Sequence, residues 1–242
     1  MQPSRTILHP ARAIITGFLP ALLLNGVACA AETNAPRHAQ FEAAIRAFEA
    51  ADRTNPPPPA AVLFVGSSSV RLWTNAAAQF PGHRIINRGF GGSHLSDSVV
   101  FAERIVIPYR PRVIVLYAGD NDIAAGKSPE QVLADFRDFT REVQAALPET
   151  RIVFLSIKPS PSRLKHLEAV RNANGLIRYF AGADPKLTYV DVFTPMLGSD
   201  GLPRGELFVG DRLHLNEAGY KLWAGIVKPV LDRVDPPRNG KP

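Results

Sequence analysis

The chain has 242 residues, enough for one domain with a substantial core. Its composition, 45% hydrophobic and 21% charged, is typical of a globular protein and argues against fibrous or disordered classes. The net charge of +6 comes from Lys and Arg residues that are scattered without long runs, so we expect a solvated surface and no nucleic-acid partner.

The first 30 residues have the pattern of a secretory signal peptide. Arg5 and Arg12 precede an apolar stretch at 13–28, and Ala28-Cys29-Ala30 forms a cleavage pattern of the A-x-A type. The apolar stretch is short and interrupted, which argues against a membrane anchor. We therefore predict export to the periplasm or the medium, with no stable membrane insertion after cleavage. The alternative is a lipoprotein that begins at Cys29, although Gly26 stands where a large aliphatic residue is usual.

Residues 31–59 are predicted to hold an N-terminal helix and a stiff connector. Phe41, Ile45 and Phe48 recur at helical spacing within 36–53, and four prolines follow at 56–59. The main domain is assigned to residues 60–234, and the proline-containing end at 235–242 is predicted to be a flexible tail.

Within the main domain, apolar β-branched runs alternate with helical patterns. We expect strands at 61–65, 84–87, 112–117, 151–157 and 187–193, and helices at 129–147, 162–182 and 216–233. Several of the strands are apolar throughout, which is typical of a parallel sheet covered on both faces. The sequence therefore predicts a doubly wound α/β sandwich, in which ligands bind at the carboxyl ends of the strands.

The residues that follow these strands match the needs of acyl transfer. They are Gly66–Ser69 after the first strand, Asn87–Ser93 after the second, Ala118–Asp122 after the third, and Asp211–Asn216 before the last helix. A serine hydroxyl needs a base to take its proton, a histidine base needs an acid to orient it, and the developing oxyanion needs fixed donors.

These four segments, GSSS, NRGFGGS, AGDND and DRLH, resemble in order the four blocks of the SGNH hydrolases, the GDSL esterase/lipase superfamily. The resemblance covers about residues 60–233. It implies a flavodoxin-like three-layer α/β/α sandwich with a five-stranded parallel sheet. It also implies Ser68 as the nucleophile, His214 as the base, Asp211 as its partner, and Ser68, Gly92 and Asn121 as the donors of the oxyanion hole.

Ser67 stands where the family name has Asp. That Asp is outside the triad, so its loss affects inferences about substrate more than inferences about hydrolysis. Ser67 and Ser69 are interpreted as helix caps, and Trp73 as a core residue. Among the histidines, His94 could line the pocket, whereas His38 and His166 are expected to be exposed.

A short capping motif explains a segment that otherwise looks like a phosphate-binding loop. Residues 121–128 end in Gly-Lys-Ser, but the opening glycine of the P-loop pattern is missing. Ser128, Pro129 and Gln131 instead predict the capped start of the helix at 129–147. We predict no cofactor, and no metal, because no histidine pair has the spacing of metal ligands.

The sequence thus predicts an exported serine hydrolase of carboxylic esters. Modest gaps between the strand ends, without a long apolar lid, favour short acyl groups, with carbohydrate O-acetyl esters as one substrate class. The alternatives are a lysophospholipase or thioesterase, an acyltransferase with the same triad, and a non-catalytic carbohydrate- or lipid-binding module on the same fold.

Overall fold

The computed structural model describes residues 34–236, so the predicted signal peptide and the end of the predicted tail lie outside the described residues. The strands are β1 (Val62–Gly66), β2 (Ile85–Gly89), β3 (Val113–Tyr117), β4 (Arg151–Leu155) and β5 (Leu187–Val190). The helices are α1 (Asn34–Ala39), α2 (Glu42–Thr54), α3 (Ser68–Arg71), α4 (Ala76–Gln79), α5 (Leu95–Val100), α6 (Ala102–Ile105), α7 (Asp120–Ala124), α8 (Pro129–Ala146), α9 (Leu167–Ala181) and α10 (Glu217–Val234). Four 3-10 turns complete the described part: η1 (Ile107–Tyr109), η2 (Pro161–His166), η3 (Thr194–Met196) and η4 (Gly205–Leu207).

The five strands form one parallel sheet in the order β2-β1-β3-β4-β5. Val62 of β1 pairs with Ile85 on one side and with Val113 on the other, so β1 is the strand at which the chain order reverses. This is the strand order of the flavodoxin-like fold, and it confirms the predicted fold class. The ends of β1 and β3 are where such a fold binds its ligands.

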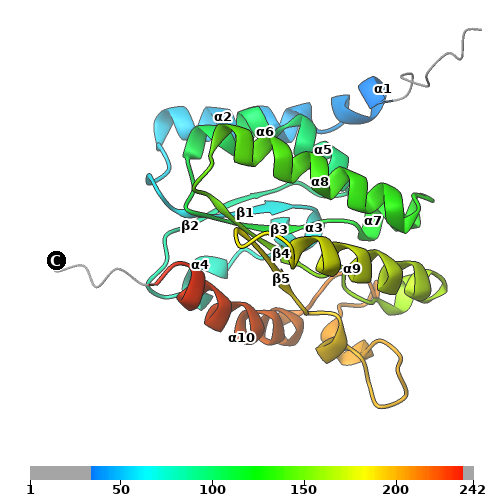
Figure 1. Ribbon diagram of the computed structural model, residues 1–242. Coiled ribbons are helices and arrows are strands. Elements are labelled where there is room, and N and C mark those ends of the chain that lie inside the picture. The colour runs from blue at the N-terminus through cyan, green and yellow to red at the C-terminus, as the bar shows by residue number, and fades with distance from the viewer. Residues whose placement is uncertain (1–33, 237–242) are drawn as a thin grey trace, which may run out of the picture. The chain divides into compact units, whose positions relative to one another are not determined.

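Helices cover both faces of the sheet. Figure 1 shows α2, α5, α6 and α8 along one face and α4 and α10 along the other. The side chains of the strands alternate between the two cores: Leu63 and Val65 pack toward α2, α5, α6, α8 and α9, whereas Val62 and Phe64 pack toward α3, α4 and α10. Burial on both faces explains why the strands are apolar throughout.

The long predicted helices are present with small shifts at their ends. The helix predicted at 129–147 is α8, and Ser128 and Gln131 form the expected capping box. The pattern at 162–182 divides into the 3-10 turn η2 and helix α9. The pattern at 36–53 divides into α1 and α2, and the buried Phe41 and Ile45 join the core of the sheet.

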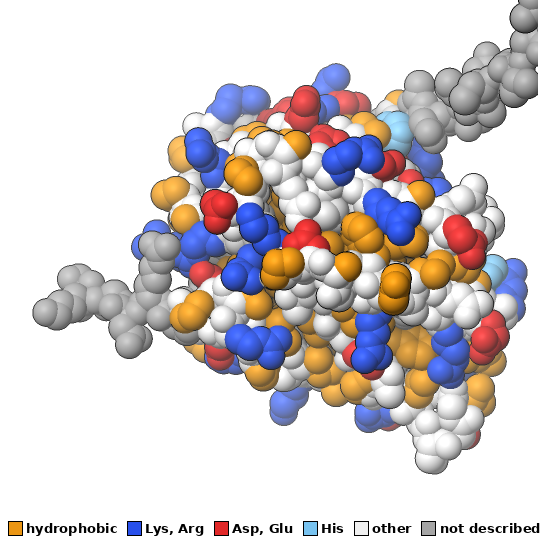
Figure 2. All heavy atoms as spheres, in the orientation of Figure 1, with side chains coloured by type: hydrophobic (Ala, Val, Ile, Leu, Met, Phe, Trp, Pro, Cys, Tyr) orange, Lys and Arg blue, Asp and Glu red, His pale blue; other side chains and the backbone are white. Residues whose placement is uncertain are grey.

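The surface carries mixed charge on the face that Figure 2 shows, where Lys and Arg side chains are interspersed with Asp and Glu. Asp235, the first residue of the predicted tail, is buried and paired with Arg112. Among residues 34–236, no helix has both the length and the apolar character that a membrane span requires.

Candidate active site

Ser68 is presented by a tight turn directly after β1. Gly66 ends the strand at φ +132°, and a Cβ at this position would lie 1.9 Å from the Tyr117 carbonyl oxygen of β3. Only glycine allows this conformation and this approach. The Ser67 N–H then donates to the Tyr117 carbonyl at 3.0 Å, and Ser68 becomes the first residue of α3.

Two side chains hold the short helix α3 in place, which its four residues could not do alone. The Tyr220 hydroxyl donates to the Ser69 carbonyl at 3.0 Å, and Asn87 Nδ2 donates to the Val70 carbonyl at 2.8 Å. Gly89 packs against the backbone of Arg71, where a Cβ would lie 2.2 Å from its nitrogen. The segment that carries Ser68 is therefore braced by both the second block and the last helix.

The structure brings Ser68, His214 and Asp211 into one chain of contacts. His214 Nε2 lies 3.0 Å from Ser68 Oγ, and His214 Nδ1 lies 2.6 Å from Asp211 Oδ2. The other oxygen of Asp211 accepts the backbone N–H groups of Leu213 and His214 at 2.9 Å each. Hydrogen bonds from the His214 backbone and ring and from the Leu213 backbone lower the pKa of Asp211 to about 2, so its carboxylate is charged at neutral pH.

The three predicted oxyanion donors belong to residues that line one pocket. Ser68, Gly92, Asn121 and His214 line a pocket of about 430 Å³ at the carboxyl ends of the strands. In the described part of the chain, the N–H groups of Ser68 and Gly92 donate to no other group. Asn121 Nδ2 donates to the Ser93 carbonyl at 3.0 Å, which leaves its second N–H available. The arrangement can hold an oxyanion next to a serine hydroxyl that contacts an imidazole base, which a carboxylate orients.

The sequence model of the GDSL-like Lipase/Acylhydrolase family matches residues 63–222, about two thirds of the chain and all of the segments just described. The chain belongs to this family. It is accordingly a carboxylic ester hydrolase by class.

Several solved structures share the fold. A Streptococcus pneumonia protein described as a candidate platelet activating factor is 23% identical, with a TM-score of 0.70 over 81% of this chain and 95% of that one. A GDSL-like lipase from Bacteroides thetaiotaomicron is 20% identical, with a TM-score of 0.67 over 78% and 97%. An acetyl-xylooligosaccharide esterase from Geobacillus is 14% identical, with a TM-score of 0.59 over 73% and 95%. No curated protein matches the chain.

A buried ionic network behind the pocket of this GDSL-like acylhydrolase was not predicted from the sequence. Lys158 Nζ lies 2.8 Å from Asp120 Oδ2 and 3.1 Å from the Tyr117 hydroxyl. Arg163 Nη1 lies 3.2 Å from the same Asp120 oxygen, and its Nη2 donates to Asn121 Oδ1 at 2.8 Å. Burial alone would raise the pKa of Asp120, but the charges of Lys158 and Arg163 lower it overall. The one sign of this network in the sequence was that Lys158 directly follows the strand predicted at 151–157.

The prediction of helix caps is confirmed for the position of Ser67 and wrong for Ser69. Ser67 occupies the N-cap position of α3, but its hydroxyl makes no capping hydrogen bond, and Ser69 lies inside the helix. Both hydroxyls are buried. Trp73 is a core residue as predicted, in contact with Phe64 and Tyr220.

The histidine predictions also need correction. His38 is not exposed, because its Nδ1 lies 2.7 Å from Asp97 Oδ1 and its side chain is mostly covered. His94 does not line the pocket and is buried at the start of α5. Phe90, in the glycine-rich segment at 87–93, is buried in the core.

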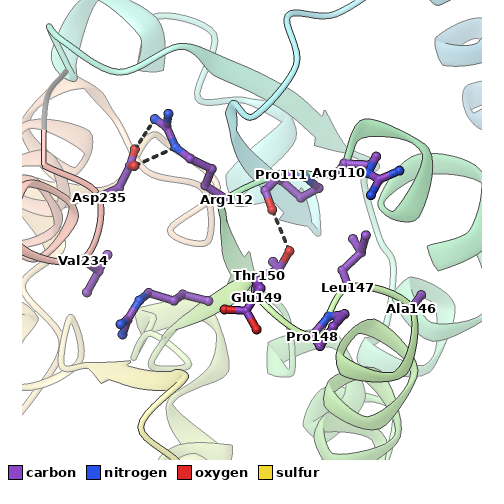
Figure 3. A pocket seen from close by; sticks show the side chains of 11 residues that line it. Arg110, Pro111, Arg112, Ala146, Leu147, Pro148, Glu149, Thr150, Val234 and Asp235 are labelled. Carbon is purple, nitrogen blue, oxygen red and sulfur yellow. Dashed lines mark hydrogen bonds and ion pairs between the residues drawn. The ribbon is translucent and has the colours of Figure 1, made fainter.

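A second cavity lies at the opposite, amino-terminal ends of β3 and β4. Its volume is about 500 Å³, and Figure 3 shows Asp235 paired with Arg112, and Thr150 hydrogen-bonded to Pro111, along its wall. Among the described residues that line this cavity there is no serine or histidine. Within the described residues, no group of three or more His, Cys, Asp or Glu side chains is placed to share a metal ion.

Proposed function

We propose that this GDSL-like acylhydrolase is an exported serine esterase that cleaves short-acyl esters with Ser68, His214 and Asp211. The observation that carries the proposal is the pair of contacts on His214, with Ser68 Oγ at 3.0 Å from one ring nitrogen and Asp211 at 2.6 Å from the other. The matching blocks at the strand ends support it further.

In the first half of the reaction, Ser68 Oγ attacks the ester carbonyl carbon and its proton passes to His214 Nε2. The N–H groups of Ser68, Gly92 and Asn121 hold the oxygen that becomes negative in the tetrahedral intermediate. The intermediate collapses, the bond to the alcohol oxygen breaks, and His214 gives the proton to that oxygen. Asp211 holds Nδ1–H throughout and stabilises the imidazolium that forms.

In the second half, His214 takes a proton from water, and the resulting oxygen nucleophile attacks the acyl carbon on Ser68. The second tetrahedral intermediate uses the same three donors. His214 then returns the proton to Ser68 Oγ, and the carboxylic acid leaves.

Short acyl groups fit the form of the site. The pocket of about 430 Å³ is open, and Leu213 is the one large apolar side chain among the described residues that line it, so it offers little apolar surface to a long chain. An acetyl-xylooligosaccharide esterase is among the proteins with a similar fold, which supports carbohydrate O-acetyl esters as one substrate class. Export is supported by the pattern at residues 1–30.

A fluorophosphonate probe that labels activated serines tests the catalytic assignment. The purified wild-type protein should be labelled once, and Ser68→Ala should not be labelled, with Ser69→Ala as the neighbouring control. Equal labelling of wild type and Ser68→Ala would refute the assignment. For the substrate, 4-nitrophenyl esters of increasing chain length should give the highest kcat/KM at acetate or butyrate, and a maximum at long chains would contradict the proposal.

A further inference from the structure

Arg71 is a charged side chain of the pocket that the proposed reaction does not use. It is the last residue of α3, it is exposed, and it lines the pocket together with Ser68 and His214. Its guanidinium rests on Gly91, where a Cβ would lie 2.8 Å from Nε and 3.4 Å from Cζ and Nη2. The cation therefore sits one residue from Gly92, a proposed oxyanion donor.

No described residue accepts a hydrogen bond from the Arg71 guanidinium or forms an ion pair with it. A guanidinium has five N–H donors and carries its charge at every pH at which proteins fold. The pocket lining contains no Asp or Glu, so Arg71 is the one permanent charge among the described residues that line it.

The other charged side chains near the site have partners of their own in the described structure. Lys158 and Arg163 share Asp120, and Asp211 accepts hydrogen bonds from Leu213 and His214. None of these carboxylates forms an ion pair with Arg71. The pocket therefore presents a cation whose donors are unused in the described structure to any molecule that binds there.

We propose that Arg71 binds a carboxylate or phosphate group carried by the ester substrate. This inference rests on the proposed function, because it places the anion next to the carbonyl that Ser68 attacks. A guanidinium can bind either group through two parallel N–H···O hydrogen bonds, which fixes orientation as well as adding affinity. Glycine at position 91 leaves room for the guanidinium to lie against the loop that carries Gly92. The substrate class is thus an ester with an anionic group close to the scissile bond.

Paired esters test this inference. On the alcohol side, 4-acetoxybenzoate is compared with its neutral methyl ester, and on the acyl side, mono-4-nitrophenyl succinate with 4-nitrophenyl butyrate, after subtraction of uncatalysed hydrolysis. We expect wild type to prefer the anionic ester, by kcat/KM, in at least one pair. Arg71→Gln should lower the ratio of anionic to neutral kcat/KM at least tenfold in that pair. Arg71→Lys, which keeps the charge but loses the planar fork, should give an intermediate ratio.

Arg141→Gln is the matched control, because Arg141 is an exposed arginine of α8 that pairs with Asp138 and is not among the residues that line the pocket. Its ratio should equal that of wild type. Added salt should reduce the wild-type preference, because an exposed ion pair is screened. Equal ratios for wild type, Arg71→Gln and Arg71→Lys in both pairs would overturn the inference while leaving the esterase assignment intact. If the wild-type protein is not labelled at Ser68 by the phosphonate probe, the esterase assignment, on which this inference rests, is refuted instead.

Discussion

At the scale of single residues, the two carboxylate oxygens of Asp211 have different partners. Oδ1 closes the turn by accepting the N–H groups of Leu213 and His214, and Oδ2 faces His214 Nδ1. The same hydrogen bonds lower its pKa to about 2. The carboxylate is consequently ionised throughout the pH range in which a histidine base can work.

Asp211→Asn should lower kcat by roughly 10³-fold or more, with a small change in KM. The asparagine can still close the turn through Oδ1, but its Nδ2 donates to His214 Nδ1 and favours the tautomer in which Nε2 cannot accept the Ser68 proton. Steady-state kinetics and the rate of phosphonate labelling check this. The matched control is Asp200→Asn, which closes a similar turn through the Leu202 N–H away from the pocket. A variant with wild-type kcat would show that Asp211 does not orient the base.

Arg163 fixes the orientation of the Asn121 amide. Because its Nη2 donates to Oδ1 at 2.8 Å, the Nδ2 group is turned toward the Ser93 carbonyl and the pocket. Asp120 holds Arg163 from the other side and is itself held by Lys158. Arg163 acts through Asn121, so it is a positioning residue in the proposed reaction.

Arg163→Met should reduce kcat about 10- to 100-fold with little change in KM, because a misplaced amide costs transition-state stabilisation more than substrate binding. Guanidinium chloride, at concentrations well below those that unfold the protein, should restore part of the lost kcat and should not raise that of wild type. Arg171→Met, an exposed arginine of α9, is the control. A variant that loses only thermal stability, with kcat unchanged, would contradict the positioning role.

At the scale of the elements, the turn between β1 and α3 depends on one glycine. Gly66→Ala should destabilise the fold by at least about 2 kcal/mol, because φ is +132° and the new Cβ would collide with the Tyr117 carbonyl. Chemical denaturation measures this. Gly225→Ala is the opposite control: this glycine lies inside α10 with no atom near its Cβ position, so alanine should stabilise by up to about 1 kcal/mol. Similar stabilities for wild type and Gly66→Ala would refute the steric argument.

The elements that the sequence predicts well are those with a long periodic pattern. Helix α8 has eighteen residues and a capping box, and the apolar strands mark their own positions. The short helices α3, α4 and α7 were not predicted, because four or five residues carry no periodic signal and are held by tertiary contacts. Tyr220 is one such contact for α3, and it lies about 150 residues further along the chain.

At the scale of the whole molecule, the parallel sheet explains why residues from four separate segments could be predicted to meet. The position of three segments at strand ends, and of the fourth just before the last helix, was readable from the sequence, and the family blocks assigned a role to each. The residues that contact and support these four segments could not be predicted from the sequence, because they depend on side-chain contacts between distant parts of the chain. Arg37 of α1, for example, reaches Asp97 and the Gly92 carbonyl, which ties the N-terminal helix to the proposed oxyanion loop.

The pH dependence of stability should show the burial of His94. Burial lowers its pKa to about 4, with Arg37 and Lys127 adding to the shift, while nearby Asp97 and Asp135 oppose it. A lowered histidine pKa means that the unfolded chain binds more protons than the folded one between pH 6.5 and 4, so the free energy of unfolding falls as the pH is lowered through this range. The loss in the free energy of unfolding should reach up to about 3 kcal/mol near pH 4.

Urea unfolding at pH 7.5 and at pH 5 measures this loss. The difference in the free energy of unfolding between the two pH values should be smaller for His94→Gln than for wild type. His166→Gln, at a partly exposed position in η2, should keep the wild-type difference. Equal differences in all three proteins would mean that His94 is not held neutral by the fold.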